Sequence, residues 1–219
     1  MIGIGLINHG RNDIFYECLD NVKKYAPVNA KFSIVDDASP VPIKGATIRH
    51  KKQKGIAASK NANLFELADC EHIFLLDSDT WPKHPKCWDR YINSGYNHLC
   101  LTWQKNVQGH GDARIKTRLM GAIAYTHANG CMLYINNRVV QGIKFDESYG
   151  LWGFEHIAFS TAIYKAGFTP HPFMDLPDSL TLFHPLDYYA KVESSVPESV
   201  RVEHAKRNRI KYEKICKEG

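Results

Sequence analysis

The stretch His-Ile-Phe-Leu-Leu-Asp-Ser-Asp, residues 72–79, says most about the fold of this chain. Four consecutive apolar residues are followed at once by two carboxylates with one serine between them. Such a run predicts a strand buried on both faces, with the acidic residues at its carboxyl end. Because residues two apart project to the same side of an extended segment, Asp77 and Asp79 are expected to direct both carboxylates to one point.

Three earlier segments repeat this plan of an apolar strand with a polar exit. Strands are expected at residues 2–7, 31–35 and 46–50, and helices at 13–25 and 56–68. This order predicts an α/β fold with a Rossmann-like, mostly parallel sheet flanked by helices. Such sheets bind ligands beyond the carboxyl ends of their strands, where the polar clusters of this chain fall.

The second half of the sequence is less regular. Strands are expected at residues 100–103, 129–135 and 179–183, and helices at 157–166 and from residue 197 onward. The polar and basic segment 104–118 contains glycine and has no periodicity, so it is expected to be a mobile loop.

Length and composition limit the class of protein. A chain of 219 residues with 44% hydrophobic and 23% charged residues can form one domain with a substantial core, which excludes disordered, collagen-like and coiled-coil proteins. No apolar run approaches the roughly 18 residues of a membrane helix, and no signal segment opens the chain. Six cysteines without a C-x-x-C pair favour reduced thiols, so we expect a soluble, cytoplasmic protein.

The net charge of +5 is unevenly distributed. The stretch Arg49–Lys54 carries +4, and the stretch from Arg201 to the end carries seven basic and three acidic residues, which leaves −3 for the remainder. Two basic patches suit anionic ligands, although a solvated basic surface is the commoner explanation of any one run.

Polar residues after the strands are candidates for binding a nucleotide and a metal. Asp77 and Asp79 could hold a hard cation together with substrate phosphates, or form a turn. Asp36 and Asp37 could accept from a base or a ribose hydroxyl, or cap a helix. The segment Gly-Ile-Ala-Ala-Ser-Lys-Asn, residues 55–61, joins a glycine to a helix start and suits a diphosphate, but it is no P-loop.

The order of these signals resembles the GT-A glycosyltransferases, especially the family-2 type. Residues 35–39, 55–61 and 76–79 are similar to the family's V-D-D-x-S, G-x-A-x-A-R-N and L-D-x-D. Residues 145–147 and 152–155 resemble the F-D-E and W-G-x-E-D/N element of β-galactosyltransferases and polypeptide N-acetylgalactosaminyltransferases. The resemblance covers about residues 2–185, and it implies a nucleotide-sugar donor, with uridine as the default base.

The same resemblance implies roles for individual residues. The metal ligands would be Asp79, His184 and Asp77, with Mn²⁺ favoured, or Mg²⁺. The donor-binding residues would be Asn8, Arg11, Asp36, Asp37, Gly55, Lys60, Asn61, Asp77, Ser78, Trp152 and Gly153. Lys60 stands where the family has arginine, so a bidentate contact would become a point-charge contact.

The main departure from the family pattern is His156, which replaces an Asp or Asn. In inverting relatives that Asp removes the proton of the acceptor hydroxyl, and an imidazole can do the same. His156 is therefore the predicted catalytic base, with Glu155 as its rival. Alternatively, His156 packs against the following helix and Glu155 orients the acceptor.

These features together predict a metal-dependent glycosyltransferase whose acceptor is a saccharide or a hydroxymethylated pyrimidine in bacteriophage DNA. The predicted catalytic domain spans residues 1–190, with a nucleotide-binding half to about residue 100, and a basic helical tail spans 191–219. The alternatives are a nucleotidyltransferase, which would need a phosphate loop richer in Gly and Lys after the first strand, and a nucleotide-sugar-binding module without turnover.

Overall fold

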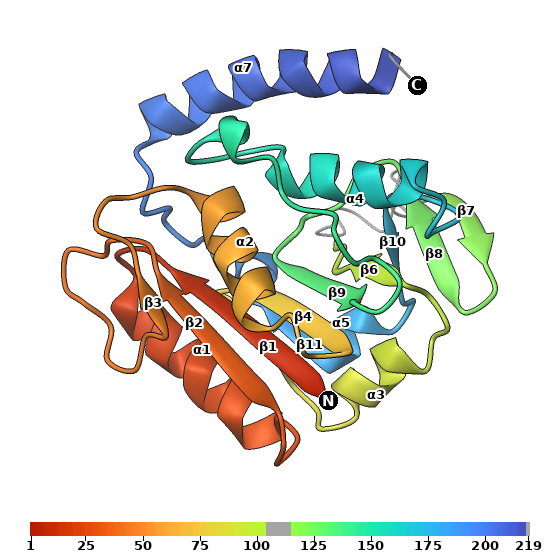
Figure 1. The fold of residues 1–219 in the computed structure, drawn as a ribbon, viewed down its shortest axis with the longest axis horizontal. Coiled ribbons are helices and arrows are strands. Elements are labelled where there is room, and N and C mark those ends of the chain that lie inside the picture. The colour runs from red at the N-terminus through yellow and green to blue at the C-terminus, as the bar shows by residue number, and fades with distance from the viewer. Residues whose placement is uncertain (104–114, 218–219) are drawn as a thin grey trace.

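A six-stranded sheet with the order β3-β2-β1-β4-β9-β6 forms the centre of the protein (Figure 1). This computed structural model describes residues 1–103 and 115–217. The strands of the sheet are β1 (Ile2–Asn8), β2 (Lys31–Asp36), β3 (Ile48–Arg49), β4 (His72–Asp77), β6 (His98–Cys100) and β9 (Met132–Asn136). The four strands from β3 to β4 are parallel, and β9 runs antiparallel to both of its neighbours. The predicted mostly parallel α/β sheet is therefore confirmed.

Two apolar cores lie on opposite faces of this sheet because the side chains of β4 alternate. Phe74 and Leu76 belong to the core that contains the buried side chains of α1 (Asn12–Tyr25). Ile73 and Leu75 belong to the core that contains Ala57 of α2 (Ile56–Glu66). All four of these β4 side chains are fully buried, as expected of a strand covered on both faces.

Smaller elements complete the fold around the central sheet (Figure 1). Two short ribbons are formed by β5 (Thr80–Pro82) with β11 (Phe183–Pro185), and by β7 (Ile115–Leu119), β8 (Ala122–Tyr125) and β10 (Met174–Asp175). The other helices are α3 (Cys87–Ile92), the 3₁₀ turn η1 (Glu147–Tyr149), α4 (Glu155–Lys165), α5 (Ser179–Leu182), α6 (Leu186–Tyr189) and α7 (Glu198–Lys217). In Figure 1, α7 crosses the molecule beyond α2 and α4. No helix in the described part of the chain is long and apolar enough to cross a bilayer.

Two expectations from the sequence differ most from the structure. The predicted loop 104–118 overlaps β7, which begins at Ile115, while residues 104–114 lie outside the described residues. The predicted strand 179–183 is mostly helix α5, whose backbone N–H groups at Ser179 and Thr181 donate to the carbonyls of Leu176 and Asp178. Strand β7 and helix α5 are both short, and short elements contain too few residues to distinguish a helical period from an extended one.

Candidate functional site

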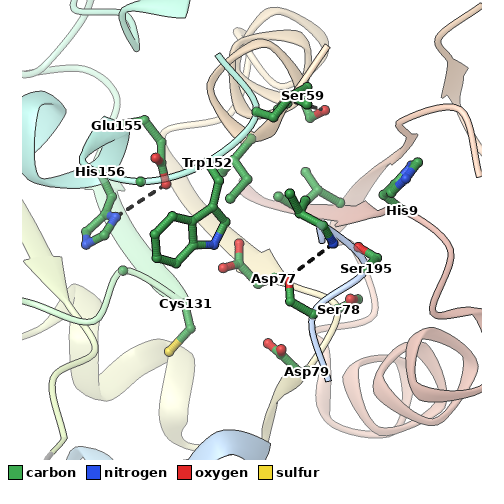
Figure 2. A pocket seen from close by; sticks show the side chains of 18 of the residues that line it. His9, Ser59, Asp77, Ser78, Asp79, Cys131, Trp152, Glu155, His156 and Ser195 are labelled. Atoms are coloured by element: carbon green, nitrogen blue, oxygen red, sulfur yellow. Dashed lines mark hydrogen bonds and ion pairs between the residues drawn. The ribbon is translucent and has the colours of Figure 1, made fainter. Parts of the chain in front are cut away.

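A cavity of about 510 Å³ lies beyond the carboxyl ends of β1 and β4. Its wall combines the strand ends with three later segments of the chain, namely residues 128–131, 151–157 and 192–196. Figure 2 shows Trp152 between the Glu155–His156 pair and the carboxylates of Asp77 and Asp79 in this view. The cavity therefore occupies the edge at which the sequence predicts ligand binding.

Asp77 and Asp79 both line the cavity, and each faces a cation. Arg11 Nη1 lies 2.9 Å from Asp79 Oδ2, and Arg11 Nη2 donates to Ser78 Oγ at 3.1 Å. Lys60 Nζ lies 3.1 Å from Asp77 Oδ1, an ion-pair distance without the geometry of a hydrogen bond, so this buried oxygen accepts none. Burial and the nearby Asp77 raise the pKa of Asp79, and the charge of Arg11 opposes this effect.

The two carboxylates fit part of a metal site. Within residues 1–103 and 115–217, no three His, Cys, Asp or Glu side chains are grouped closely enough to hold an ion. A hard divalent cation accepts one or two carboxylates when substrate phosphates and water complete its shell. The carboxylate oxygens of Asp77 and Asp79, which both line the cavity, meet this requirement.

His184, the third predicted metal ligand, is not among the residues that line the cavity. Its ring stacks between Trp81 and Tyr189, with centroid separations of 4.7 Å and 4.2 Å. Its backbone is close to the carboxylate pair, because β11 pairs with β5 and the N–H of Leu186 donates to the carbonyl of Asp79. The stack occupies the two faces of the imidazole ring and leaves its two nitrogens at the ring edge.

The two acidic residues after β2 have different positions. Asp36 is buried and accepts from the N–H groups of Ser39 and Ile43 and from Arg49. Burial opposes its ionisation, but these hydrogen bonds outweigh that effect and lower the pKa of Asp36. Only Asp37 of the pair lines the cavity.

Asp37 is itself held in place by hydrogen bonds. Its Oδ1 accepts from the N–H of Lys54 at 2.8 Å and contacts His50 Nδ1 at 2.7 Å, and its Oδ2 accepts from the N–H of Gly55 at 2.8 Å. This carboxylate therefore fixes the loop before α2 at the rim of the cavity.

The remaining predicted donor-binding residues divide into two groups. Those that line the cavity are Asn8, Arg11, Gly55, Ser78, Trp152 and Gly153. Lys60 and Asn61 lie behind the wall. Lys60 is buried and donates to the carbonyl of Gly130 at 3.0 Å, and Asn61 bonds both the N–H and the carbonyl of Phe145.

Glu155 and His156 begin α4 at the opposite side of the cavity and form a pair. His156 Nδ1 lies 3.4 Å from Glu155 Oε1, and His156 Nε2 lies 3.1 Å from the carbonyl of Ala128. Both ring nitrogens thus face oxygen acceptors. Burial would raise the pKa of Glu155, but the contact with His156 and the charge of Lys60 outweigh it and lower the pKa. Glu155 Oε2 is buried and has no hydrogen-bond partner among the described residues.

A buried asparagine of α7 fixes the loop that carries Trp152. Asn208 Nδ2 lies 2.8–2.9 Å from the carbonyl oxygens of Tyr149, Trp152 and Gly153, and Asn208 is 1% exposed. The loop needs such a donor because a buried carbonyl without a hydrogen bond is costly. Phe154, the non-glycine residue that follows Gly153 in this loop, has φ 72°.

Sequence reasoning missed the contribution of residues 192–208 to the cavity. Ser194, Ser195, Val196, Arg201 and Ala205 line it, and Asn208 supports it. The one available signal was an asparagine within a helix of charged residues, where an amide side chain is uncommon unless it has a specific partner.

Solved structures share this fold. TarS of S. aureus has 13% identity and a TM-score of 0.53 over 74% of this chain and 54% of its own. The mannosyltransferase PcManGT of Pyrobaculum calidifontis, solved with GDP-Man and Mn²⁺, has 13% identity and a TM-score of 0.53 over 77% and 53%. GalNAc-T7, solved with UDP, GalNAc and Mn²⁺, has 11% identity and a TM-score of 0.58 over 90% and 46%.

The present chain thus spans about half the length of each of these proteins. No family model and no curated protein sequence matches it. At such low identity the similarity concerns the fold alone, and it confirms the predicted GT-A fold.

We expect Asn208→Ala to destabilise the protein, because it removes the amide that faces three inward-directed carbonyls, of which the carbonyl of Tyr149 keeps Arg207 as a donor. The loss in the free energy of unfolding should be about 1–3 kcal/mol, measured by urea denaturation. Arg209→Ala is the matched control on the same helix, since its side chain is 71% exposed and forms a surface pair with Glu213. Equal losses for the two variants would contradict this role of Asn208.

Proposed function

We propose that this chain, which has the GT-A fold, is a metal-dependent glycosyltransferase that transfers a sugar from a nucleoside diphosphate sugar to an acceptor hydroxyl. The observation that carries the proposal is the cavity itself, which has Asp77, Ser78 and Asp79 in one wall and Glu155 in another. Uridine is the default base by resemblance, and guanosine competes because PcManGT was solved with GDP-Man.

In this proposal Asp77 and Asp79 hold a divalent cation, Mn²⁺ or Mg²⁺, which stabilises negative charge on the departing diphosphate when bound. Arg11 keeps the Asp79 carboxylate oriented from one side, and Lys60 does so for Asp77 from behind the wall. Asp37 and Asn8 line the part of the cavity next to β1 and β2, where the base and ribose would bind.

The geometry favours Glu155 over His156 as the base for the acceptor hydroxyl. A base needs a lone pair directed at the acceptor hydroxyl, whereas both nitrogens of His156 are directed at protein oxygens, Nδ1 at Glu155 Oε1 and Nε2 at the carbonyl of Ala128. Glu155 has a lowered pKa and an unpartnered oxygen in a residue that lines the cavity. His156 then acts as a positioning residue that holds the other oxygen of Glu155.

The acceptor is a saccharide hydroxyl in the reading that we favour, with a hydroxymethylated pyrimidine in DNA as the second candidate. The DNA reading depends on the basic charge of α7. Several of these cations have partners within the protein, since Lys211 pairs with Asp146, Arg209 with Glu213, and Arg207 donates to the carbonyl of Tyr149. Fewer charges are thus available to a polyanion than the sequence suggests.

Incubation with a panel of UDP- and GDP-sugars and Mn²⁺ should release the nucleoside diphosphate from at least one donor. Asp79→Asn removes a hard anionic ligand, so release should fall to near background, and EDTA should abolish it reversibly. Asp178→Asn is the control, because that carboxylate pairs with Arg90 outside the cavity wall. Full turnover in EDTA would contradict the metal dependence.

Glu155→Gln should lower transfer to the acceptor by roughly 10²–10⁴-fold while the affinity for the donor stays nearly unchanged. His156→Ala should have a smaller effect, because it removes a contact to Glu155 and no proton acceptor. Transfer rates under saturating donor, together with donor titrations, measure both. The opposite ranking of the two variants would identify His156 as the base.

We expect no sugar to be added to duplex DNA that contains hydroxymethylated pyrimidines, as judged by mass spectrometry of digested nucleosides. A gel shift across a salt series should likewise show little salt-dependent binding. Two results together would identify DNA as the acceptor. The first is a DNA affinity that falls steeply with salt, with a log–log slope that becomes shallower by roughly 0.9 per lost contact in the double variant Lys206→Gln, Lys214→Gln. The second is added hexose or pentose mass on the digested nucleosides.

A further inference from the structure

Arg201, in the first turn of α7, lines the cavity although its helix lies outside the central sheet. Its guanidinium carbon lies 5.7 Å from the centroid of the Trp152 ring, the side chain that Figure 2 shows at the centre of the site. Its Nε is buried without a hydrogen-bond partner, and no ion pair between described residues includes Arg201. A buried donor in this state is costly unless a ligand supplies the acceptor.

The charges around the cavity show what that ligand would be. Among the described residues that line the cavity, the Lys or Arg residues are Arg11 and Arg201. Arg11 is already paired with Asp79, and Lys60, behind the wall, is paired with Asp77. Arg201 is thus the arginine of the wall that has no carboxylate partner in the described structure. An anionic ligand among several carboxylates needs such a cation.

The position of Arg201 is fixed from two sides. The cation–π contact with the indole holds the guanidinium over the Trp152 ring, and the N–H groups of a guanidinium remain able to donate to acceptors in its own plane. Farther along α7, Asn208 binds the carbonyls around Trp152, and Tyr212 Oη lies 2.9 Å from Thr161 Oγ1 of α4. The helix and the loop of Trp152 therefore form one wall, and Arg201 is part of it.

We propose that Arg201 binds the diphosphate of the donor, so that α7 completes the donor site. This inference rests on the proposed function, because it assigns a ligand class to the same cavity. A planar guanidinium matches two phosphate oxygens, which an ammonium group does not. The diphosphate would then be held by Arg201 on one side and by the cation at Asp77 and Asp79 on the other.

Binding of UDP, GDP, uridine and guanosine, each with Mn²⁺, tests this inference by isothermal titration. Arg201→Gln should weaken the affinity for the preferred nucleoside diphosphate by roughly 10–100-fold and leave the affinity for the matching nucleoside unchanged. Arg201→Lys should lose less. Arg209→Gln removes the same charge from an exposed position of the same helix and should bind like the wild type.

The possible outcomes separate this inference from the proposed function. If the wild type binds neither UDP nor GDP, the proposed function fails, and this inference fails with it. If the wild type binds one of them and Arg201→Gln binds it equally well, the inference alone is overturned. A parallel loss of nucleoside and diphosphate affinity, with a lowered melting temperature, would show that Arg201 only packs against Trp152, which also overturns it.

Discussion

Asp77, which is partly buried, ends strand β4, and the buried Asp79 follows it, in surroundings where a carboxylate needs a nearby positive charge or hydrogen-bond donors to remain an anion. The cations come from two different helical segments, Arg11 from the start of α1 and Lys60 from α2. Because both neighbouring carboxylates need a cation, their ion pairs hold the start of α1 and helix α2 against the carboxyl end of β4. The cavity lies at this meeting point.

Lys60 extends this constraint to the other side of the cavity. Its ammonium group reaches both Asp77 and the carbonyl of Gly130. The ring of His156 packs so closely on Gly130 that a Cβ there would clash with it, and His156 in turn contacts Glu155. A single chain of contacts thus joins the carboxylate pair to the candidate base. Lys60 organises the site from behind the wall, although the motif in which it occurs suggests direct contact with a diphosphate.

The sequence predicts the sheet and the cavity edge well, because buried parallel strands are continuous apolar runs with polar residues at their ends. It does not show which of two adjacent acidic residues faces inward. Asp36 and Asp37 are equivalent in the pattern, but three donors surround Asp36 within the protein, and only Asp37 reaches the cavity. The direction of a side chain depends on loop hydrogen bonds between residues far apart in the sequence, which local periodicity does not encode.

The C-terminal helix shows why counting charges is a weaker guide than accounting for their partners. Its net charge of +4 predicts that it binds a polyanionic ligand. In the structure, however, its basic residues have separate roles. Lys211 pairs with Asp146, Arg209 pairs with Glu213, and Arg201 lines the cavity. Solvated charges interact weakly with any one ligand because water and salt screen them. The guanidinium of Arg201, whose Nε is buried beside an indole, is partly desolvated in advance, so a contact that it makes with an anion is stronger than one at a solvated position. The ligand of a basic helix therefore depends on its least solvated cation more than on its net charge.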